Sequence, residues 1–266
     1  MKVVLFCGGL GTRLRDLSGE VPKPMVKIGY RPILWHVMRY YAHFGHKDFV
    51  LCLGYKADAI KQFFLTYEEW ISNDFTLSNG GKRIDLENND IDDWNITFVD
   101  TGLHANIGQR LLAVRKYIEN EEMFLANYAD GLTDLNLSEM VSAFRASGKV
   151  ASFLAVPPAQ SFHLVDLEDS GDVTAIRPVS ESNLMINGGY FAFRRELFDY
   201  IYPGDELVNE PFGRLIKERQ LLGYRYDRLW VMDTFKEQQQ LSDMYESGCA
   251  PWEVWSRSPN GERVAC

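Results

Sequence analysis

Residues 2–14 read KVVLFCGGLGTRL, an apolar run that passes directly into a loop rich in glycine. The run 2–7 has the length and the β-branched, apolar content of a buried strand. Gly8, Gly9 and Gly11 follow it. Because glycine has no Cβ, the backbone there can come close to a phosphate and donate its N–H groups. The stretch therefore predicts a strand that ends in an anion-binding loop.

Polar and basic side chains accompany this loop. Thr12 supplies a hydroxyl, and Arg13 can pair with two phosphate oxygens at once. Lys23 lies between two prolines that restrict the local backbone, so its ammonium can meet an anion at a small ordering cost. Two common phosphate loops do not fit, because no Gly-Lys-Ser/Thr follows and Leu14 replaces the third glycine of a dinucleotide fingerprint. A turn that merely happens to be rich in glycine is the alternative that this stretch alone leaves open.

Strand-like and helix-like segments alternate through the first half of the chain. Strands are predicted at 2–7, 48–53, 94–99 and 123–128, and helices at 33–44, 56–65, 108–117 and 137–146. This alternation is typical of an α/β fold with a mostly parallel central sheet and helices on both faces. Ligands of such sheets bind outside the carboxyl ends of the strands. The candidate loops are therefore those at Gly8, Gly54, Asp100 and Asp130.

The second half follows a different pattern. Short runs that predict strands follow one another at 152–156, 163–167, 173–176 and 190–193. They indicate antiparallel additions, so we expect a mixed sheet. A C-terminal helix is expected from Phe235 to Gly248. No internal repeat and no Pro/Gly/Ser linker is visible, and we therefore expect one domain, 1–255, followed by a tail, 256–266.

The stretch 72–93 interrupts the first half. It is polar, with Asn79-Gly80-Gly81 near its middle and an acidic run at 85–93. We expect a long excursion with one hairpin, and disorder is the alternative. Such an excursion is a candidate for an arm between subunits.

The composition excludes several classes of protein. Of the 266 residues, 46% are hydrophobic, which is enough for a sizeable core. The net charge of −9 argues against a nucleic-acid or membrane-surface partner, although local basic loops can still hold a phosphorylated substrate. No apolar run approaches the ~18 residues of a membrane span. The four cysteines have no paired spacing, from which we expect a reduced, cytoplasmic enzyme.

A longer set of motifs adds a resemblance to these local signals. GGLGTRL at 8–14 and PKPM at 22–25 resemble the signature of the sugar-phosphate nucleotidyltransferases. Further motifs of that family follow in order: PILWH at 32–36, GYK at 54–56, WNIT at 94–97, VDTG at 99–102, GQRL at 108–111, INGGYF at 186–191, MDT at 232–234 and GCAPW at 248–252. The WNIT and APW pieces are particular to the cytidylyl branch. The resemblance covers residues 1–255 and implies a Rossmann-like nucleotidyltransferase fold.

The resemblance implies a reaction in which a sugar-phosphate oxygen attacks the α-phosphorus of a nucleoside triphosphate and pyrophosphate leaves. In the cytidylyl branch the substrates would be CTP and α-D-glucose 1-phosphate, and the product would be CDP-glucose. Two anions with about six negative charges must meet, so the protein's main work is to position them and to neutralise charge. The resemblance also implies Mg²⁺, for which one or two carboxylates suffice, and a homo-oligomer.

By this resemblance, Asp130 and Asp233 form the metal pair. Asp130 follows the predicted strand 123–128, and Asp233 precedes the predicted helix that begins at Phe235. The alternative is that one carboxylate starts a turn and the other caps a helix, and both roles are compatible because a cap and a ligand use the same oxygens. Ala129 stands where the family usually has glycine, a departure that only tightens the loop.

The resemblance also assigns a nucleotide site and a catalytic set. The nucleotide-binding residues would be Leu5, Cys7, Gly8, Gly9, Gly11, Thr12, Arg13, Lys23, Thr101 and Arg110. The catalytic residues would be Arg13, Lys23 and Asp130. Leu5 to Cys7 would present backbone groups to the pyrimidine edge. Without its motif, Arg110 would be expected to be a solvated arginine near the start of a helix.

For the sugar phosphate, the resemblance assigns Asn187, Gly188, Gly189 and Arg177. The small residues would allow a pyranose to lie against the backbone, and a plain turn between two strands is the alternative. The family usually has Glu-Lys-Pro where this chain has Ile176-Arg177-Pro178. Arginine keeps the positive charge of that lysine but changes its reach and donor geometry. This departure concerns the recognition of the sugar and not the class of reaction.

Three alternatives stay open from the sequence. One is the same reaction with another sugar phosphate or another nucleoside triphosphate. Another is a nucleotide-sugar glycosyltransferase, although such enzymes generally hold their metal with Asp-x-Asp and the nearest acid to Asp130 is Asp134. The third is an inactive, nucleotide-binding regulatory subunit, which the altered Ile176-Arg177 pair alone supports.

Overall fold

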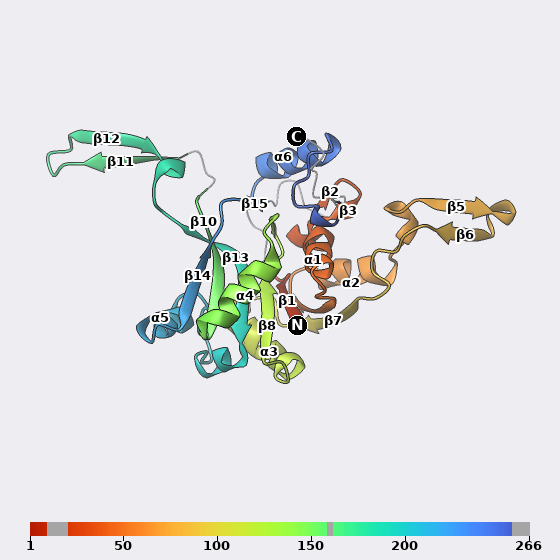
Figure 1. Ribbon diagram of the computed structural model, residues 1–266, viewed down its shortest axis with the longest axis horizontal. Coiled ribbons are helices and arrows are strands. Elements are labelled where there is room, and N and C mark those ends of the chain that lie inside the picture. The colour runs from red at the N-terminus through yellow and green to blue at the C-terminus, as the bar shows by residue number, and fades with distance from the viewer. Residues whose placement is uncertain (10–20, 159–161, 257–266) are drawn as a thin grey trace.

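A seven-stranded sheet forms the centre of the molecule in the structure, a computed structural model that describes residues 1–9, 21–158 and 162–256. Figure 1 shows the sheet and the parts of the chain that project from the body. In sheet order the strands are β14 (Leu221–Arg225), β10 (Ala151–Val156), β13 (Ile186–Arg194), β8 (Met123–Asn127), β1 (Lys2–Phe6), β4 (Asp48–Leu53) and β7 (Asn95–Asp100).

The direction of the strands confirms a mixed, mostly parallel sheet. Strands β8, β1, β4 and β7 are parallel neighbours, and β14 is parallel to β10. Only β13 runs against its two neighbours, β8 and β10. Because the parallel strands end at one edge, the loops after β1, β4, β7 and β8 meet there.

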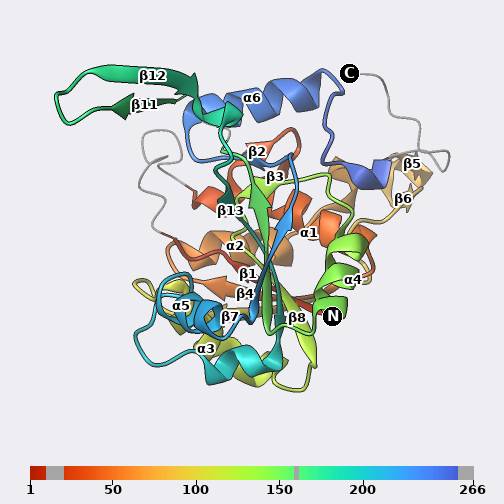
Figure 2. The same cartoon turned by 60° about the vertical axis from the view of Figure 1, so that its left-hand side comes forward.

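Helices cover both faces of this sheet (Figure 2). The covering helices are α1 (Ile33–His43), α2 (Ala57–Leu65), α3 (Ile107–Ile118), α4 (Leu137–Ser147) and α5 (Glu210–Lys217). A further helix, α6 (Phe235–Glu246), lies beyond the sheet, above it in Figure 2. Alternate residues of β1 supply the two cores: Val3 and Leu5 pack in a cluster with α1 and α4, whereas Val4 and Phe6 pack in a cluster with α3 and α5. A strand with both faces covered needs a continuous apolar run, which residues 2–7 provide.

Four pairs of short strands lie outside the sheet. They are β2 (Lys27–Ile28) with β3 (Arg31–Pro32), β5 (Phe75–Ser78) with β6 (Arg83–Leu86), β9 (Gly131–Leu132) with β15 (Trp230–Val231), and β11 (His163–Leu167) with β12 (Val173–Pro178). The expectation that 163–167 and 173–176 extend the central sheet is therefore wrong. These two runs pair only with each other, because the connection between β10 and β13 carries them away from the sheet edge.

The excursion 72–93 contains one hairpin, β5–β6, as predicted. Its base is held by the buried Arg31, whose guanidinium donates to Ser72 Oγ (2.9 Å) and to the Glu68 carbonyl (2.8 Å). The same guanidinium lies 3.5 Å from the buried carboxylate of Asp90. A buried ion pair needs hydrogen bonds to its remaining groups, and this one has them. The two ends of the excursion are thus tied to the body of the protein.

Two further expectations concern the membrane and the cysteines. None of the described helices has the length and apolar character that a membrane span requires. Cys7 and Cys52 are buried free thiols.

Candidate active site

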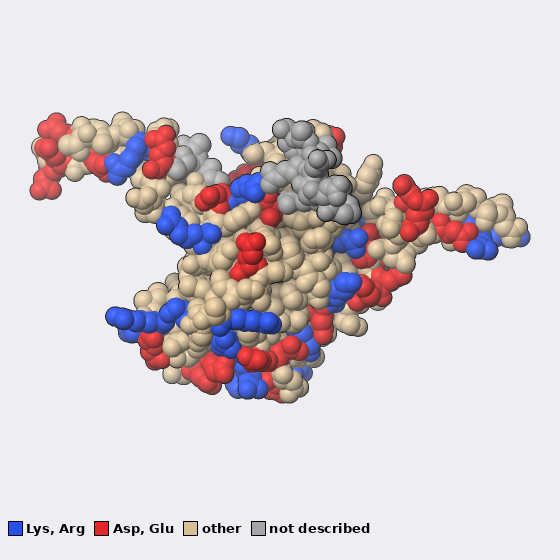
Figure 3. Space-filling view, viewed as in Figure 1, with Lys and Arg blue, Asp and Glu red and all other residues tan. Residues whose placement is uncertain are grey.

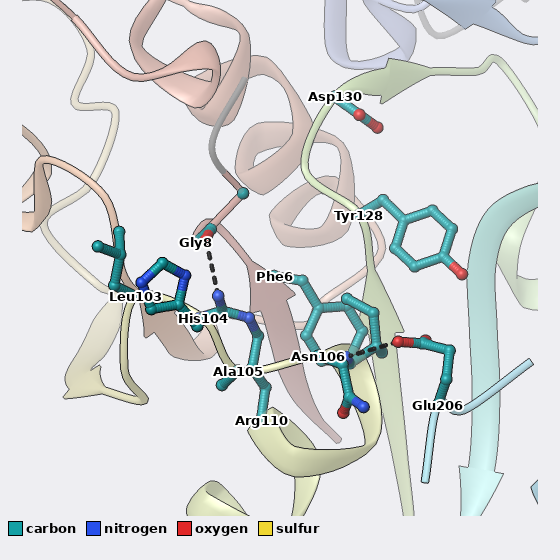
Figure 4. A pocket seen from close by; sticks show the side chains of 12 residues that line it. Phe6, Gly8, Leu103, His104, Ala105, Asn106, Arg110, Tyr128, Asp130 and Glu206 are labelled. Carbon is teal, nitrogen blue, oxygen red and sulfur yellow. Dashed lines mark hydrogen bonds between the residues drawn. The ribbon is translucent and has the colours of Figure 1, made fainter. Parts of the chain in front are cut away.

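Two cavities open at the edge where the parallel strands end. The first, which we call the glycine-loop cavity, has a volume of about 500 Å³. It is lined by Phe6, Gly8, Gly9, Leu103, His104, Ala105, Asn106, Ile107, Arg110, Tyr128, Asp130 and Glu206 (Figure 4). It therefore combines the loop after β1 with the N-terminus of α3, two places that offer backbone N–H groups to an anion.

Arg110 ties the ends of three strands together. Its guanidinium donates to the carbonyls of Gly8 (2.6 Å) and Leu53 (3.1 Å) and to Thr101 Oγ1 (2.5 Å). Its exposed fraction is only 3%, so the alternative of a solvated arginine is wrong. A Cβ placed on Gly8 would lie 2.1 Å from Arg110 Nη1. Glycine is thus required at position 8 for this contact.

The second cavity, which we call the β13 cavity, has a volume of about 320 Å³. It is lined by Tyr128, Asp130, Gly131, Val156, Pro157, Ile186, Asn187, Gly188, Leu229, Trp230, Val231, Asp233, Glu237, Gln240 and Leu241. Tyr128 and Asp130 line both cavities. A ligand in one cavity and a ligand in the other would therefore meet at Asp130.

Asp130, Asp233 and Lys23 form an ion cluster between the cavities. Lys23 Nζ donates to Asp130 Oδ2 at 2.7 Å and also to Asp233 Oδ1. Burial disfavours the charged ammonium, but the two carboxylates outweigh this effect and raise the pKa of Lys23. Burial also raises the pKa of Asp130, and the ammonium of Lys23 only partly offsets that rise. Burial thus favours the protonated form of Asp130, whereas the Lys23 ammonium favours its ionised form.

The loop that presents Asp130 is held by its neighbours. Ala129 has a φ of 61°, in the left-handed region that favours glycine. Its N–H donates to Asn127 Oδ1 at 2.6 Å, which holds the turn after β8. The chain therefore tolerates alanine here, at a cost of about 1–2 kcal/mol for a Cβ in this conformation.

The carboxylates of Asp130 and Asp233 fit a divalent cation. Both bind one ammonium, so their oxygens converge on a common position that a cation can occupy. Among the described residues no group of three or more His, Cys, Asp or Glu side chains could hold a metal. Two carboxylates suit Mg²⁺, which keeps several water ligands. The residue that caps α6 is Thr234, whose side chain accepts from Glu237 N, so Asp233 is not the cap.

The comparisons with known proteins agree with this geometry. The family model described as "Nucleotidyl transferase" matches residues 2–219. The chain belongs to the nucleotidyl transferase family. It is 36% identical to the glucose-1-phosphate cytidylyltransferases of Salmonella typhi and Salmonella typhimurium strain LT2, over 96% of this chain and 100% of each relative. A structure of UDP-glucose pyrophosphorylase complexed with UDP-glucose shares the fold, with a TM-score of 0.67 at 13% identity and coverage of 92% of this chain and 98% of that one.

The structure of this nucleotidyl transferase brings together many of the residues expected from the sequence. Gly8, Gly9, Arg110 and Asp130 line the glycine-loop cavity, and Asn187, Gly188 and Asp233 line the β13 cavity. Lys23 contacts both metal candidates, and Thr101 contacts Arg110. Asn187, Gly188 and Gly189 lie inside β13, so the alternative of a plain turn between two strands is wrong.

Some expected residues do not line either cavity, and others are outside the described part of this nucleotidyl transferase. Leu5 and Cys7 are fully buried, and the Cys7 N–H is already donated to the Cys52 carbonyl at 3.0 Å. Arg177 lies on the β11–β12 hairpin, where its guanidinium pairs with Asp166 and does not line either cavity. Three residues of the glycine loop lie outside the described part of the chain: Gly11, Thr12 and Arg13.

Sequence reasoning missed several residues that line the two cavities, among them Tyr128 and Glu206. Tyr128 immediately precedes Ala129-Asp130, so its place at a strand end was a signal that could have found it. Glu206 accepts from the Ile107 N–H at 3.4 Å, 99 residues away along the chain. No local pattern predicts such a contact, because it depends on how the loop before α5 reaches α3.

Proposed function

We propose that this nucleotidyl transferase joins CTP to α-D-glucose 1-phosphate, forming CDP-glucose and releasing pyrophosphate. The observation that carries the proposal is that Asp130 lines two adjoining cavities, one beside the glycine loop and one beside Asn187 and Gly188. A two-substrate reaction needs such an arrangement, since both substrates must meet at one point. The names of the Salmonella relatives supply the identities of the nucleotide and the sugar phosphate.

The chain's own residues would position the substrates and balance their charge. Gly8 and Gly9 would allow the triphosphate to approach the backbone after β1, and Arg13 would contact it from the same loop. Lys23 would place its ammonium beside the reacting phosphates, next to Asp130. Mg²⁺ held by Asp130 and Asp233, when bound, supplies positive charge where the transferred phosphate gains negative charge. Such preorganised charge is the main contribution of proteins to phosphoryl-type transfers.

A specific contact argues against a glycosyltransferase. Asp134, the acid nearest to Asp130 in sequence on its C-terminal side, accepts from the Tyr226 hydroxyl at 2.8 Å. It also lies 2.9 Å from Arg228 Nη2. The carboxylate of Asp134 is thus engaged by Tyr226 and Arg228. Asp134 is also not among the described residues that line either cavity.

We further propose that the chain works as a homo-oligomer. The β5–β6 and β11–β12 hairpins project from opposite sides of the body (Figures 1 and 2). In each hairpin the strand register places apolar side chains together on one face. These exposed side chains are Phe75, Leu77 and Ile84 in the first hairpin and Val165, Leu167, Val173 and Ile176 in the second. A second copy of the chain would cover faces of this kind, and charged residues of both signs are interspersed around them (Figure 3).

Pyrophosphate release tests the enzymatic proposal. Purified protein would be assayed with Mg²⁺ over a grid of CTP, UTP, dTTP, ATP and GTP against several sugar 1-phosphates. We expect the highest rate with CTP and glucose 1-phosphate, because a buried edge that pairs with cytosine loses about 1–3 kcal/mol with uracil. Equal use of ATP and CTP would refute the cytidylyl assignment but keep the class of reaction. No release with any pair would refute the class as well.

A further inference from the structure

An aromatic ring separates the two cavities. Tyr128 follows β8 directly, and it lines both cavities together with Asp130. Its ring packs against Phe191, with centroids 5.1 Å apart, and against Phe6, with centroids 6.2 Å apart. Figure 4 shows the ring at the boundary of the glycine-loop cavity, with Asp130 on one side of it and Glu206 on the other. The position of the ring is thus fixed by packing.

The backbone of β13 is shaped around this ring. Gly189 has a φ of 74°, and a Cβ placed there would lie 2.5 Å from Tyr128 Cδ2. Only glycine both adopts this conformation and leaves space for the tyrosine. The second cavity therefore depends on the close approach of Gly189 and Tyr128.

The Tyr128 hydroxyl accepts a hydrogen bond from the β13 side. Its oxygen accepts from Asn187 Nδ2 at 3.4 Å, and Asn187 Oδ1 accepts from the Gly189 N–H at 2.9 Å. Among the described residues, the Tyr128 hydroxyl donates to no acceptor. An ordinary phenol keeps its proton at neutral pH. A hydroxyl in this state donates a hydrogen bond to a neutral oxygen acceptor.

We propose that the Tyr128 hydroxyl donates to one hydroxyl oxygen of the sugar bound in the β13 cavity, and so helps to select the sugar. Asn187 holds the phenol oxygen from the β13 side, which directs the free proton towards the ligand. This inference rests on the proposed function, because it takes the β13 cavity as the sugar site. It makes Tyr128 a specificity residue that lies against Asp130 without contributing a charge to the cluster.

Tyr128→Phe tests the contact, because it removes one oxygen and keeps the ring that packs against Gly189. The assay measures kcat/KM for glucose 1-phosphate and for its 2-, 3-, 4- and 6-deoxy analogues, with wild type and variant. In the wild type, the analogue that lacks the contacted hydroxyl should lose about tenfold in kcat/KM. In Tyr128→Phe, glucose 1-phosphate should lose about tenfold, and that same analogue should lose nothing further. The KM for CTP should stay unchanged.

Tyr202→Phe is the matched control, since this exposed tyrosine lies outside both cavities. It should behave as wild type in every assay, and both variants should unfold at the wild-type temperature. If Tyr128→Phe keeps the wild-type ratios for all analogues, the tyrosine contact is wrong even though the enzyme is active. If wild type releases no pyrophosphate, the proposed function fails, and calorimetric binding of glucose 1-phosphate to both proteins decides the contact by itself. Equal affinities of wild type and Tyr128→Phe for glucose 1-phosphate would overturn the proposed contact.

Discussion

The guanidinium of Arg110 occupies the space beside Gly8 in which a side chain at residue 8 would lie. The two residues are 102 positions apart, and their hydrogen bond of 2.6 Å joins the loop after β1 to α3. Because Arg110 also donates to Leu53 and Thr101, it fixes the ends of β1, β4 and β7 relative to one another. The first residue of the glycine loop, Gly8, is therefore held in place by these hydrogen bonds of Arg110.

Gly8→Ala should disturb the hydrogen bonds that Arg110 makes with the strand ends. Its Cβ would lie 2.1 Å from Arg110 Nη1, so the guanidinium must move and lose its buried hydrogen bonds. We expect a loss of about 1–3 kcal/mol in the free energy of unfolding and a higher KM for CTP, measured by denaturant titration and by pyrophosphate release. Gly9→Ala is the matched control, because a Cβ at residue 9 meets no atom of the described residues within 4 Å. Equal stability losses in the two variants would contradict the proposed clash.

Lys23→Met should strengthen the binding of Mg²⁺ while it weakens turnover. In the free protein the ammonium neutralises Asp130 and Asp233, so it competes with a metal for the same oxygens. Removing one positive charge at this distance should raise the affinity for Mg²⁺ about tenfold or more in the absence of nucleotide. Calorimetric titration with MgCl₂ would show the change, with the exposed Lys27→Met as control. A weaker affinity for Mg²⁺ in Lys23→Met would mean that the ammonium and the metal do not compete for the same carboxylate oxygens.

Asp130→Asn should separate activity from stability. Burial raises the pKa of Asp130, so the folded state disfavours the ionised carboxylate that a metal needs. We expect turnover to fall by at least about 100-fold, because charge stabilisation at the reacting phosphate is lost. The free energy of unfolding at pH 7 should not fall. For the wild type, kcat/KM should decline on acidification at a higher pH than an ordinary aspartate predicts, because the raised pKa places protonation there.

The exposed Asp227→Asn serves as the control for that variant. It should keep both turnover and stability. If Asp130→Asn turned over its substrates at the wild-type rate in the presence of Mg²⁺, Asp130 would not be a ligand of the metal. If it unfolded at much lower denaturant concentration, the carboxylate would stabilise the fold and the prediction of unchanged stability would be wrong.

Local patterns were sufficient for most of the central elements. The apolar run Asp48–Leu53 predicted β4 without error, and the spacing at 33–44 predicted α1 to within one residue. Such runs determine which residues are buried, and burial on both faces of a strand leaves few alternatives. The carboxyl ends of parallel strands share an edge, so Gly8 and Asp130 could be expected to meet before any contact was known.

Contacts between distant segments could not be predicted in this way. The periodicity of α3 does not show that Arg110 faces Gly8, since that contact depends on how α3 packs on the sheet. The run 163–167 predicted a strand, but the partner of that strand is set by the path of the chain after β10. Resemblance found Arg110 by its motif, whereas its role in holding the strand ends required the structure.

Glu253→Gln should change the dependence of stability on pH. Burial raises the pKa of Glu253 from 4.5 to about 7, so the folded state binds this proton more tightly than the unfolded chain does. The stability that the protonated form contributes is fully present below pH 4.5 and is lost as the pH rises to about 7. The variant should therefore match wild type at pH 4.5 and be more stable at pH 8, by up to about 2 kcal/mol after allowing for partial exposure. Thermal unfolding at both pH values checks this, with the exposed Glu246→Gln as control, and equal gains at both would contradict it.

Arg177→Ala decides whether this arginine meets the sugar phosphate. No Lys or Arg is among the described residues that line the β13 cavity, so a cation for that phosphate must come from beside it. Arg177 is one residue from the end of β12, and in the free protein it pairs with Asp166 on the polar face of the hairpin. If it turns to the substrate, Arg177→Ala should raise the KM for glucose 1-phosphate at least about tenfold and leave the KM for CTP unchanged. Michaelis curves with each substrate varied in turn measure both constants.

Asp166→Ala separates this role from a structural one. It breaks the same ion pair but leaves the guanidinium free, so the KM for glucose 1-phosphate should stay the same or fall. An exposed pair of this kind contributes little stability, about 0–1 kcal/mol, so neither variant should lower the unfolding temperature appreciably. If both variants leave the KM for glucose 1-phosphate unchanged, Arg177 only pairs with Asp166 on the hairpin surface. The sugar phosphate would then be held by Lys23 or by a residue of the glycine loop, and the substitution of the family's lysine by arginine would carry no information about the sugar.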